Sequence, residues 1–411
     1  MEPVKSVSIA RCEIIAAYCF VTYHTIVSRS CEIQRTYLMR FPIISFLLLC
    51  GSAHASIAPD GAPMESSFHP CNVEACGTDT ILGFHLNDHL LEGNKVFGET
   101  FFAAVGRPNF FRTMFAPAKI TLVYKPSTGE IYQESKDYIR TENGIQLTPN
   151  SNIQSAPAGF SDQLSEFEKI NYGVRITTEF QNFQYAINYE KQEVFTPKIY
   201  GDLGSLSKKL GKNVINITFY GDSITLGANA TSIYTSPHQP GYVGLVMAYL
   251  SSKYPNMVQF RNNSVGGWNS KDAVKAVDYR VIDKKSDLII LAFGINDEGY
   301  SPEKYKKNMK SLIDKIRDRD SAVPILVVSP TRSNPDIIVK KKRDAKGSLL
   351  ALEALTREYD AVALADVTSV WDFMLSKKSY LDITGNGLNH PNDFSHRIIA
   401  EVVLKAILDD R

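Results

Sequence analysis

The alternation of short apolar runs with amphipathic helices after Pro197 constrains the fold of this chain more than any other feature. The apolar runs, each of strand length, lie at 214–219, 258–261, 288–292, 325–328 and 362–365. Between two of them, apolar residues recur at the spacing of one helix face, at Tyr305, Met309, Leu312 and Ile316. Continuously apolar strands separated by helices are typical of a parallel sheet covered on both faces. We therefore predict an α/β domain over residues 201–411.

Residues 56–200 have a different pattern, which is typical of antiparallel strands. Turn residues at 126–129 separate two short apolar runs, and apolar and polar residues alternate at 174–180. This pattern predicts a β-sandwich domain, jelly-roll-like, followed by a linker. Its aromatic residues could line a sugar-binding face, although packing in the core is their more common use.

Residues 1–55 have the composition of a leader and signal peptide. Met39-Arg40 precedes an apolar run at 41–50, and small residues follow up to Ala55. The run is shorter than the roughly 20 residues of a membrane-spanning helix, so a cleaved secretory signal is favoured. We expect that Met39 is the true start and that the protein is secreted or periplasmic. A membrane anchor formed by the whole segment and a lipoprotein modified at Cys50 are the alternatives.

The cysteines agree with export, because only Cys71 and Cys76 lie outside the predicted leader. Two cysteines this close in sequence could close a small disulfide loop in an oxidising compartment. A zinc site would need more ligands than these thiols and His69 supply. We expect a disulfide, and neither a metal nor an organic cofactor.

The charges nearly cancel, with 45 basic and 44 acidic residues. This balance provides no field that would gather nucleic acid or an anionic membrane. We therefore expect a neutral or small substrate, no nucleic-acid partner, and no strong membrane association once the signal is cleaved.

The first apolar strand of the α/β domain ends in Gly221-Asp222-Ser223-Ile224. Ligands of open parallel sheets bind beyond the carboxyl ends of the strands, so Ser223 lies where a substrate would be expected. A serine in such a strand-to-helix turn can also be a simple helix cap, and by itself it is weak evidence.

The next two strands end in residues that can donate hydrogen bonds to a developing oxyanion. The second ends in Gly266-Gly267-Trp268 and the third in Gly294-Ile295-Asn296-Asp297. Backbone amides and an Asn carboxamide are the donors that acyl transfer requires, although each segment alone could be an ordinary turn. His390, just before the last predicted helix and followed by Pro391, is the candidate base.

Taken together, these segments resemble blocks I, II, III and V of the SGNH or GDSL hydrolases. The matching residues occur in the family order, at Gly221-Asp222-Ser223-Ile224, Gly266-Gly267, Gly294-Ile295-Asn296-Asp297 and His390-Pro391-Asn392. The resemblance implies a flavodoxin-like three-layer α/β/α domain. It also implies Ser223 as nucleophile, His390 as base, and the Ser223 amide, Gly267 and Asn296 as oxyanion donors, where Gly267 is the last glycine of its block.

The third member of the triad departs from the family pattern. The family generally has an aspartate three residues before the histidine, and Gly387 stands there in this chain. Asp382 could orient the imidazole, and Asp393 and a backbone carbonyl are rivals. A Ser-His pair without a carboxylate occurs in the related family 2 carbohydrate esterases, which join a β-sandwich to such a hydrolase domain.

The resemblance implies a carboxylic ester hydrolase, and by analogy we expect acetyl esters on a glycan or polysaccharide as substrates. Trp268, Tyr234 and Tyr300 could stack on a sugar or wall a small acyl pocket. A lipase or thioesterase, a glycan O-acyltransferase, and an inactive glycan-binding protein are the alternatives. Hydrolysis that depends on Ser223 would separate an enzyme from a binding protein.

Overall fold

The computed structural model describes residues 89–297, 299–337 and 345–408. All of these described residues belong to one compact unit. The predicted leader at 1–55 and the predicted disulfide between Cys71 and Cys76 lie outside the described residues, so both stay predictions.

Residues 199–408, called the α/β region here, are built around a six-stranded sheet with the order β10-β9-β11-β12-β13-β8. Its strands are parallel except β8, which pairs antiparallel to β13. They are β8 (Ile199–Gly201), β9 (Ile215–Gly221), β10 (Val258–Asn262), β11 (Leu288–Ala292), β12 (Ile325–Val328) and β13 (Val362–Ala365). The predicted α/β architecture is therefore confirmed, but the sheet is mixed and not wholly parallel, because the short edge strand β8, which was not predicted, is antiparallel to β13.

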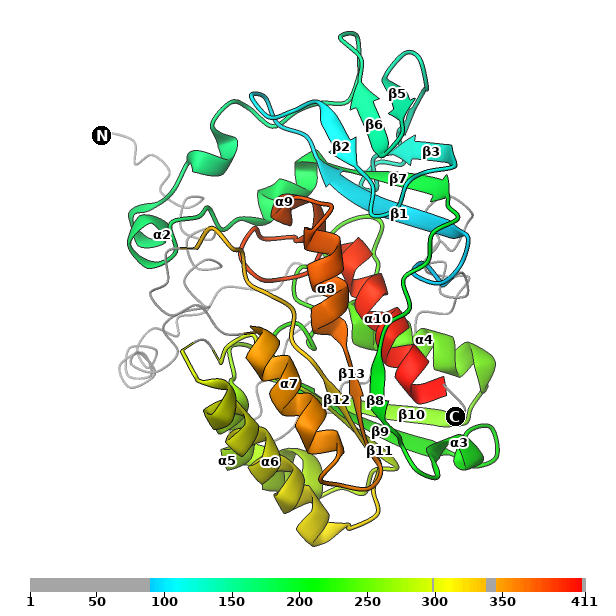
Figure 1. The fold of residues 1–411 in the computed structure, drawn as a ribbon, viewed down its shortest axis with the longest axis vertical. Helices are drawn as coiled ribbons and strands as arrows, with labels where there is room; N and C mark the ends of the chain where they lie inside the picture. Colours follow the sequence, from blue (N-terminus) through cyan, green and yellow to red (C-terminus); the bar gives the residue numbers. More distant parts are fainter. Residues whose placement is uncertain (1–88, 298, 338–344, 409–411) are drawn as a thin grey trace, which may run out of the picture. The chain divides into compact units, whose positions relative to one another are not determined.

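Helices bury both faces of this sheet, and this explains why its strands are apolar throughout (Figure 1). Along β11, Leu288 and Ile290 belong to one apolar cluster, whereas Ile289 and Leu291 belong to another. The first face is covered by α4 (Tyr242–Lys253), α8 (Val367–Leu375) and α10 (Asp393–Leu408), and the second by α5 (Ser270–Val277), α6 (Pro302–Arg319) and α7 (Ala345–Thr356). Short helical segments α3 (Leu206–Lys209), η3 (Asp278–Ile282) and α9 (Tyr380–Ile383) complete the region.

Residues 89–198, called the strand-rich region here, form two small antiparallel sheets with the orders β1-β7-β3-β4 and β2-β6-β5. Their strands are β1 (Lys95–Phe102), β2 (Phe110–Arg112), β3 (Lys119–Tyr124), β4 (Ile131–Tyr132), β5 (Tyr138–Thr141), β6 (Gly144–Leu147) and β7 (Gln184–Glu190). Before β7 come η1 (Phe160–Asp162), α2 (Glu166–Asn171) and η2 (Thr178–Phe183). The alternation at 174–180 is therefore not a strand, because Thr177 caps η2 by accepting a hydrogen bond from the Glu179 amide. A jelly-roll-like sandwich and the boundary at 200 stay predictions.

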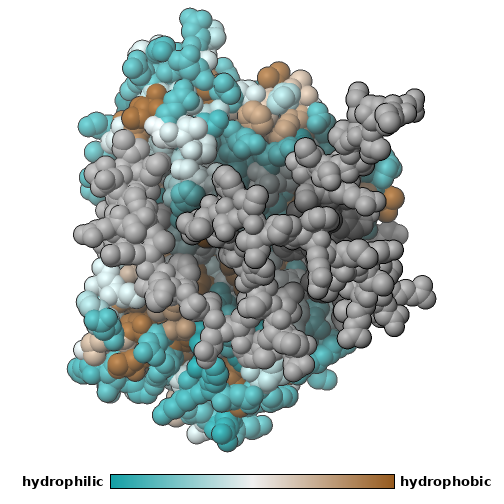
Figure 2. Space-filling view, turned by 180° about the vertical axis from the view of Figure 1, so that it is seen from behind, coloured by the Kyte–Doolittle hydropathy of each residue, from teal (hydrophilic) through white to brown (hydrophobic). Residues whose placement is uncertain are grey.

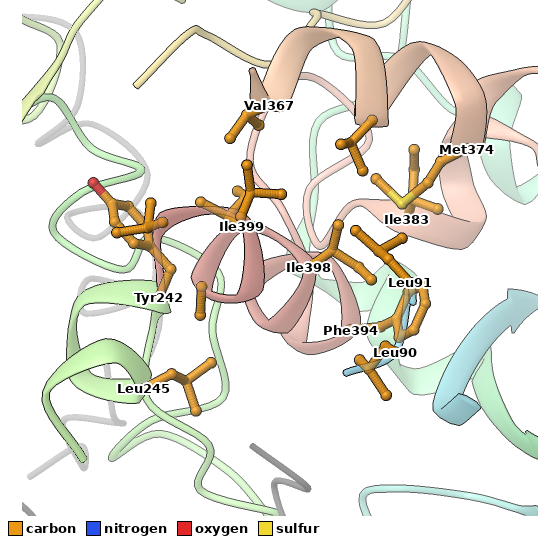
Figure 3. Close-up of a cluster of buried hydrophobic side chains, with 14 of the residues drawn as sticks. Leu90, Leu91, Tyr242, Leu245, Val367, Met374, Ile383, Phe394, Ile398 and Ile399 are labelled. Atoms are coloured by element: carbon orange, nitrogen blue, oxygen red, sulfur yellow. The ribbon is translucent and has the colours of Figure 1, made fainter. Parts of the chain in front are cut away.

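The strand-rich region shares one apolar core with the first face of the large sheet. Leu90 and Leu91, which precede β1, lie beside Phe394 and Ile398 of α10 (Figure 3). All four side chains are buried. The two regions therefore pack as one unit and share apolar contacts near the end of the chain.

A buried ion pair also joins the two regions. The Glu99 carboxylate of β1 lies 2.8 Å from the Lys378 ammonium, and both side chains are fully buried. Glu99 also accepts hydrogen bonds from the Tyr189 hydroxyl and the Met114 amide, while Lys378 donates to the Arg112 carbonyl. Loss of one partner from such a pair leaves an uncompensated charge in a medium of low dielectric.

The visible face in Figure 2 is mainly hydrophilic where its residues are coloured, with hydrophobic residues in separate small groups. Among the described residues, the most exposed large apolar side chains are Tyr234 at 83%, Ile233 at 77% and Ile170 at 74%. None of the described helices is both long and apolar enough to cross a membrane.

We expect Lys378→Met to lower the free energy of unfolding by about 3–5 kcal/mol, because it leaves the Glu99 carboxylate buried without its cation. Chemical denaturation followed by fluorescence measures this change. Lys377→Met is the matched control, because the neighbouring Lys377 is exposed, and its effect should stay within about 0.5 kcal/mol. Equally small losses in both variants would contradict a structural role for the pair.

Candidate active site

Ser223 lies in the turn that follows β9, at the carboxyl end of the large sheet. The Asp222 carboxylate accepts a hydrogen bond from the Ile224 amide at 2.9 Å, and the Ser223 carbonyl accepts one from the Ala228 amide at 2.9 Å. These bonds fix the turn locally. Gly221 is required before it, because a Cβ at this position would lie 2.7 Å from the Ala292 carbonyl oxygen of β11.

His390 lies within hydrogen-bond distance of this serine, with 2.9 Å between Ser223 Oγ and His390 Nε2. The two residues are far apart in the sequence, and each stands at an end of regular structure. Desolvation lowers the pKa of His390 from 6.5 to about 4. The imidazole is therefore neutral at neutral pH, which is the state that can accept a proton.

The Asn386 carboxamide holds the loop before His390. Asn386 Oδ1 accepts hydrogen bonds from the amides of Leu388, Asn389 and His390 at 3.0, 3.1 and 3.1 Å. The His390 carbonyl accepts from the Gly385 amide at 3.0 Å, which closes the loop on itself. The backbone that carries the imidazole is thus fixed on both sides.

Polar side chains of the strand-rich region support the same segment. Gln184 donates to the carbonyls of Leu381 and Thr384 at 2.6 and 2.7 Å. Asn392, just after His390, donates to Gln184 Oε1 at 3.1 Å and to the Thr100 hydroxyl at 3.0 Å. These groups are buried, and a buried donor or acceptor without a hydrogen-bond partner would destabilise the fold.

The second nitrogen of the imidazole contacts Asn229, with 2.7 Å between His390 Nδ1 and Asn229 Oδ1. This carboxamide occupies the place that a carboxylate takes in a Ser-His-Asp triad. Asn229 has a φ of 64°, a left-handed conformation in which Asn is several-fold enriched among residues with a side chain. This contact could not be predicted from the sequence, because Asn in a Gly- and Thr-containing loop is also a common turn residue.

Asp382, the predicted orienting acid, makes a different set of contacts in the structure. Its two carboxylate oxygens accept hydrogen bonds from the Phe102 and Ser379 amides, both at 2.8 Å. With Ser379 it forms the capping box of α9. The prediction that Asp382 orients His390 is therefore at variance with the geometry, because both oxygens are directed to backbone amides and the imidazole contacts Asn229.

Asp393, the rival candidate, is also directed elsewhere. Its carboxylate accepts hydrogen bonds from the Thr231 amide and hydroxyl at 2.8 and 2.7 Å. Burial raises the pKa of this carboxyl from 3.8 to about 6. Asp393 thus anchors the start of the loop that carries Tyr234.

Gly387, which stands where the family has its aspartate, leaves no space for a side chain. Its φ is 73°, and a Cβ would lie 2.6 Å from the Phe180 ring and 3.0 Å from the Arg175 carbonyl oxygen. The strand-rich region therefore fills the position from which an acid at 387 would reach the imidazole.

The predicted oxyanion donors lie on the loops after β10 and β11. Val265 and Trp268 donate their amides to backbone carbonyls, and within the described part of the chain the amides of Gly266 and Gly267 have no hydrogen-bond partner. Both glycines are exposed, and a Cβ at Gly266 would lie 3.9 Å from Ser223 Cβ. These free amides are therefore accessible close to the nucleophile.

Asn296 lies beside this glycine loop. Its carboxamide nitrogen donates to the Trp268 carbonyl at 3.0 Å and keeps one further N–H. The neighbouring Asp297 fixes the loop, since its carboxylate accepts a hydrogen bond from the Ser270 amide at 3.1 Å. The three loops together present the donor types that stabilise an oxyanion.

The three aromatic residues predicted to contact substrate differ in their surroundings. Trp268 is partly exposed, with the Arg280 guanidinium 5.0 Å from its ring centroid. Tyr300 is partly exposed, with the Lys304 ammonium 3.7 Å from its ring centroid. Tyr234 is largely exposed on the loop anchored by Asp393. Their roles in binding stay predictions.

Residues 219–398 match the profile of the GDSL-like Lipase/Acylhydrolase family. A search of curated proteins finds no match. The similar solved structures include two that are 21% identical to this chain. One is an acetylxylan esterase from Geobacillus stearothermophilus, with a TM-score of 0.41, covering 48% of this chain and 96% of that chain. The other is an alpha/beta hydrolase from the metagenome of Lake Arreo, Spain, with a TM-score of 0.38, covering 49% and 100%.

A putative GDSL-like lipase from Parabacteroides merdae is 18% identical, with a TM-score of 0.41, over 48% of this chain and 96% of that chain. The resemblance that the four sequence blocks carry is confirmed by the family match, which begins in β9 and ends in α10. Within the α/β region, residues 219–398 are thus similar to the GDSL-like Lipase/Acylhydrolase family.

Proposed function

We propose that this protein is a serine esterase that hydrolyses acetyl esters on a glycan through an acyl-enzyme at Ser223. The observation that carries the proposal is the 2.9 Å contact between Ser223 Oγ and His390 Nε2. Free amides beside the nucleophile add the second requirement of acyl transfer, a set of donors where negative charge develops. This combination favours an active enzyme over an inactive binding protein.

In the proposed reaction, neutral His390 accepts the Ser223 proton while Oγ attacks the ester carbonyl carbon. The negative charge that develops on the carbonyl oxygen is held by the Ser223 amide, the Gly267 amide and the Asn296 carboxamide. The imidazolium then gives its proton to the sugar oxygen as the bond between this oxygen and the acyl carbon breaks, which leaves the acetyl group on Ser223 and releases the sugar hydroxyl. Water, activated by His390 in the same way, releases acetate and restores the serine.

A glycan ester fits the exposed surface beside the nucleophile better than a long-chain lipid ester. Gly266 and Gly267 are exposed to solvent, and Trp268 provides a partly exposed aromatic face beside them. Aromatic faces bind sugars without requiring charge on the ligand. Secretion or a periplasmic location, where acetylated polymers are met, is part of the same proposal.

We expect Ser223→Ala to lower kcat by about 10⁴-fold or more, because the nucleophile is removed while the oxyanion donors remain. Acetate release from acetylated xylan and p-nitrophenol release from its acetate ester measure this. Ser252→Ala, at an exposed serine of α4, is the matched control and should retain full activity. Activity that survives in Ser223→Ala would overturn the proposal, and so would a folded wild-type protein that hydrolyses neither ester.

We expect the acid limb of kcat/KM to fall near pH 4, because the pKa of His390 is lowered to about 4 and only the neutral imidazole can act as base. Activity should rise with pH through this value and level off above it. Burial also lowers the pKa of His396 to about 4. His396→Asn is therefore the control, and the acid limb of its pH profile should stay at the wild-type pH. Acetate release at each pH, with fluorescence to verify folding, makes the measurement, and a limb near 6.5 would contradict the expectation.

A further inference from the structure

We infer that Asn229 is the positioning residue of His390, in place of a carboxylate, and that Gln181 of the strand-rich region holds Asn229 in position. The inference rests on the proposed function, since it assigns a role to residues around the base of that reaction. It gives the strand-rich region a part in catalysis that is independent of any binding of glycans.

The contact between Asn229 and His390 selects one tautomer of the imidazole. Because Asn229 Oδ1 can only accept, the nitrogen 2.7 Å away, His390 Nδ1, carries the proton. The other nitrogen, Nε2, then presents its lone pair to Ser223 Oγ at 2.9 Å. This is the tautomer that a general base needs, and a carboxamide turned to donate from its nitrogen would impose the opposite one.

Asn229 is held by contacts from two other segments. Gln181 in η2 donates its carboxamide N–H to the Asn229 carbonyl at 2.8 Å. Gly385, in the loop before His390, permits this approach, because a Cβ there would lie 2.4 Å from Gln181 Nε2 and 2.7 Å from Asn229 Cβ. The loop of Asn229, the loop of His390 and η2 therefore meet at one point.

The same short helix η2 blocks the usual position of the acid. Phe180, adjacent to Gln181, lies against Gly387, where a Cβ would be 2.6 Å from its ring. Thr177, the N-cap of η2, donates its amide to the Asn386 carbonyl at 3.2 Å. The strand-rich region thus excludes a side chain at position 387 and supports the carboxamide that contacts the imidazole.

A neutral positioning residue has an electrostatic consequence that can be measured. Desolvation is the cause of the lowered pKa of His390, and no carboxylate among the described residues counteracts it. Burial also lowers the pKa of His396, which is therefore neutral at neutral pH. Asp382 and Asp393, from α9 and α10, are directed to backbone amides and to Thr231. Among the residues that the structure describes, a carboxylate introduced at position 229 would therefore be the first negative charge in contact with the imidazole.

The test is the pH profile of Asn229→Asp in the full-length protein. A carboxylate favours the imidazolium, so the pKa of His390 should rise and the acid limb of kcat/KM should move up by about 1–3 pH units. Asp tolerates the left-handed backbone of this position much as Asn does. An unmoved limb in a folded and active Asn229→Asp would overturn the inference.

Two further variants separate positioning from folding. Asn229→Ala should lower kcat by about 10²-fold with little change in KM for the acetate ester, because the imidazole loses its alignment. Gln181→Met keeps the length of the side chain but removes the donor, and kcat should fall by about 3- to 10-fold, the value of one neutral hydrogen bond.

Asp382→Asn is the control, for which we expect a reduced melting temperature and an acid limb at the wild-type pH. A limb that moves in Asp382→Asn and not in Asn229→Asp would return the role to Asp382.

Nuclear magnetic resonance of the ring nitrogens tests the contact without reference to activity. Comparison with His390→Ala assigns the His390 signals, and the inference requires a proton on Nδ1 at neutral pH. A proton on Nε2 would overturn it. If the tautomer is as stated but Ser223→Ala leaves hydrolysis intact, the proposed function fails and the contact stands; if Ser223 is essential and the tautomer is opposite, only the inference fails.

Discussion

Burial of the parallel sheet on both faces is the constraint on which the rest of this structure depends. Because the central strands alternate their side chains between two apolar cores, the loops beyond the strand ends are where polar groups can meet a substrate. The order β10-β9-β11 sets three such ends side by side. Ser223, the free glycine amides and Asn296 follow these three strands, so the topology brings the nucleophile and its donors together before any side-chain contact is considered.

The base is positioned by a different kind of structure. His390 stands on a loop without regular hydrogen bonding, and that loop is fixed by buried carboxamides of Asn386, Asn392 and Gln184. Gln184 comes from the strand-rich region, as does Thr100, which donates to the Asp382 carbonyl. The α/β region supplies the reacting groups, and the strand-rich region completes the support of the base.

The residues of the site that stand next to regular strands and helices could be predicted from the sequence. The residues whose roles depend on contacts between distant segments could not. Ser223, Asn296 and His390 could be identified because each stands at the end of a recognisable strand or before a recognisable helix. Asn229 could not, since its contact with His390 depends on how two loops meet. The capping role of Asp382 could have been predicted, because Ser379 three residues earlier completes the pattern of a capping box. That pattern predicts a helix cap, which is the role the structure shows.

The surroundings of Gly387 permit only one of two ways to orient the imidazole: an aspartate at position 387, or Asn229 held by Gln181. An aspartate at this position would have to displace Phe180, and with it the short helix that carries Gln181. A chain that keeps η2 in place therefore has no room for the acid, and a chain that gains the acid loses the support of Asn229. The sequence at position 387 is therefore constrained by the strand-rich region, although the two lie far apart along the chain.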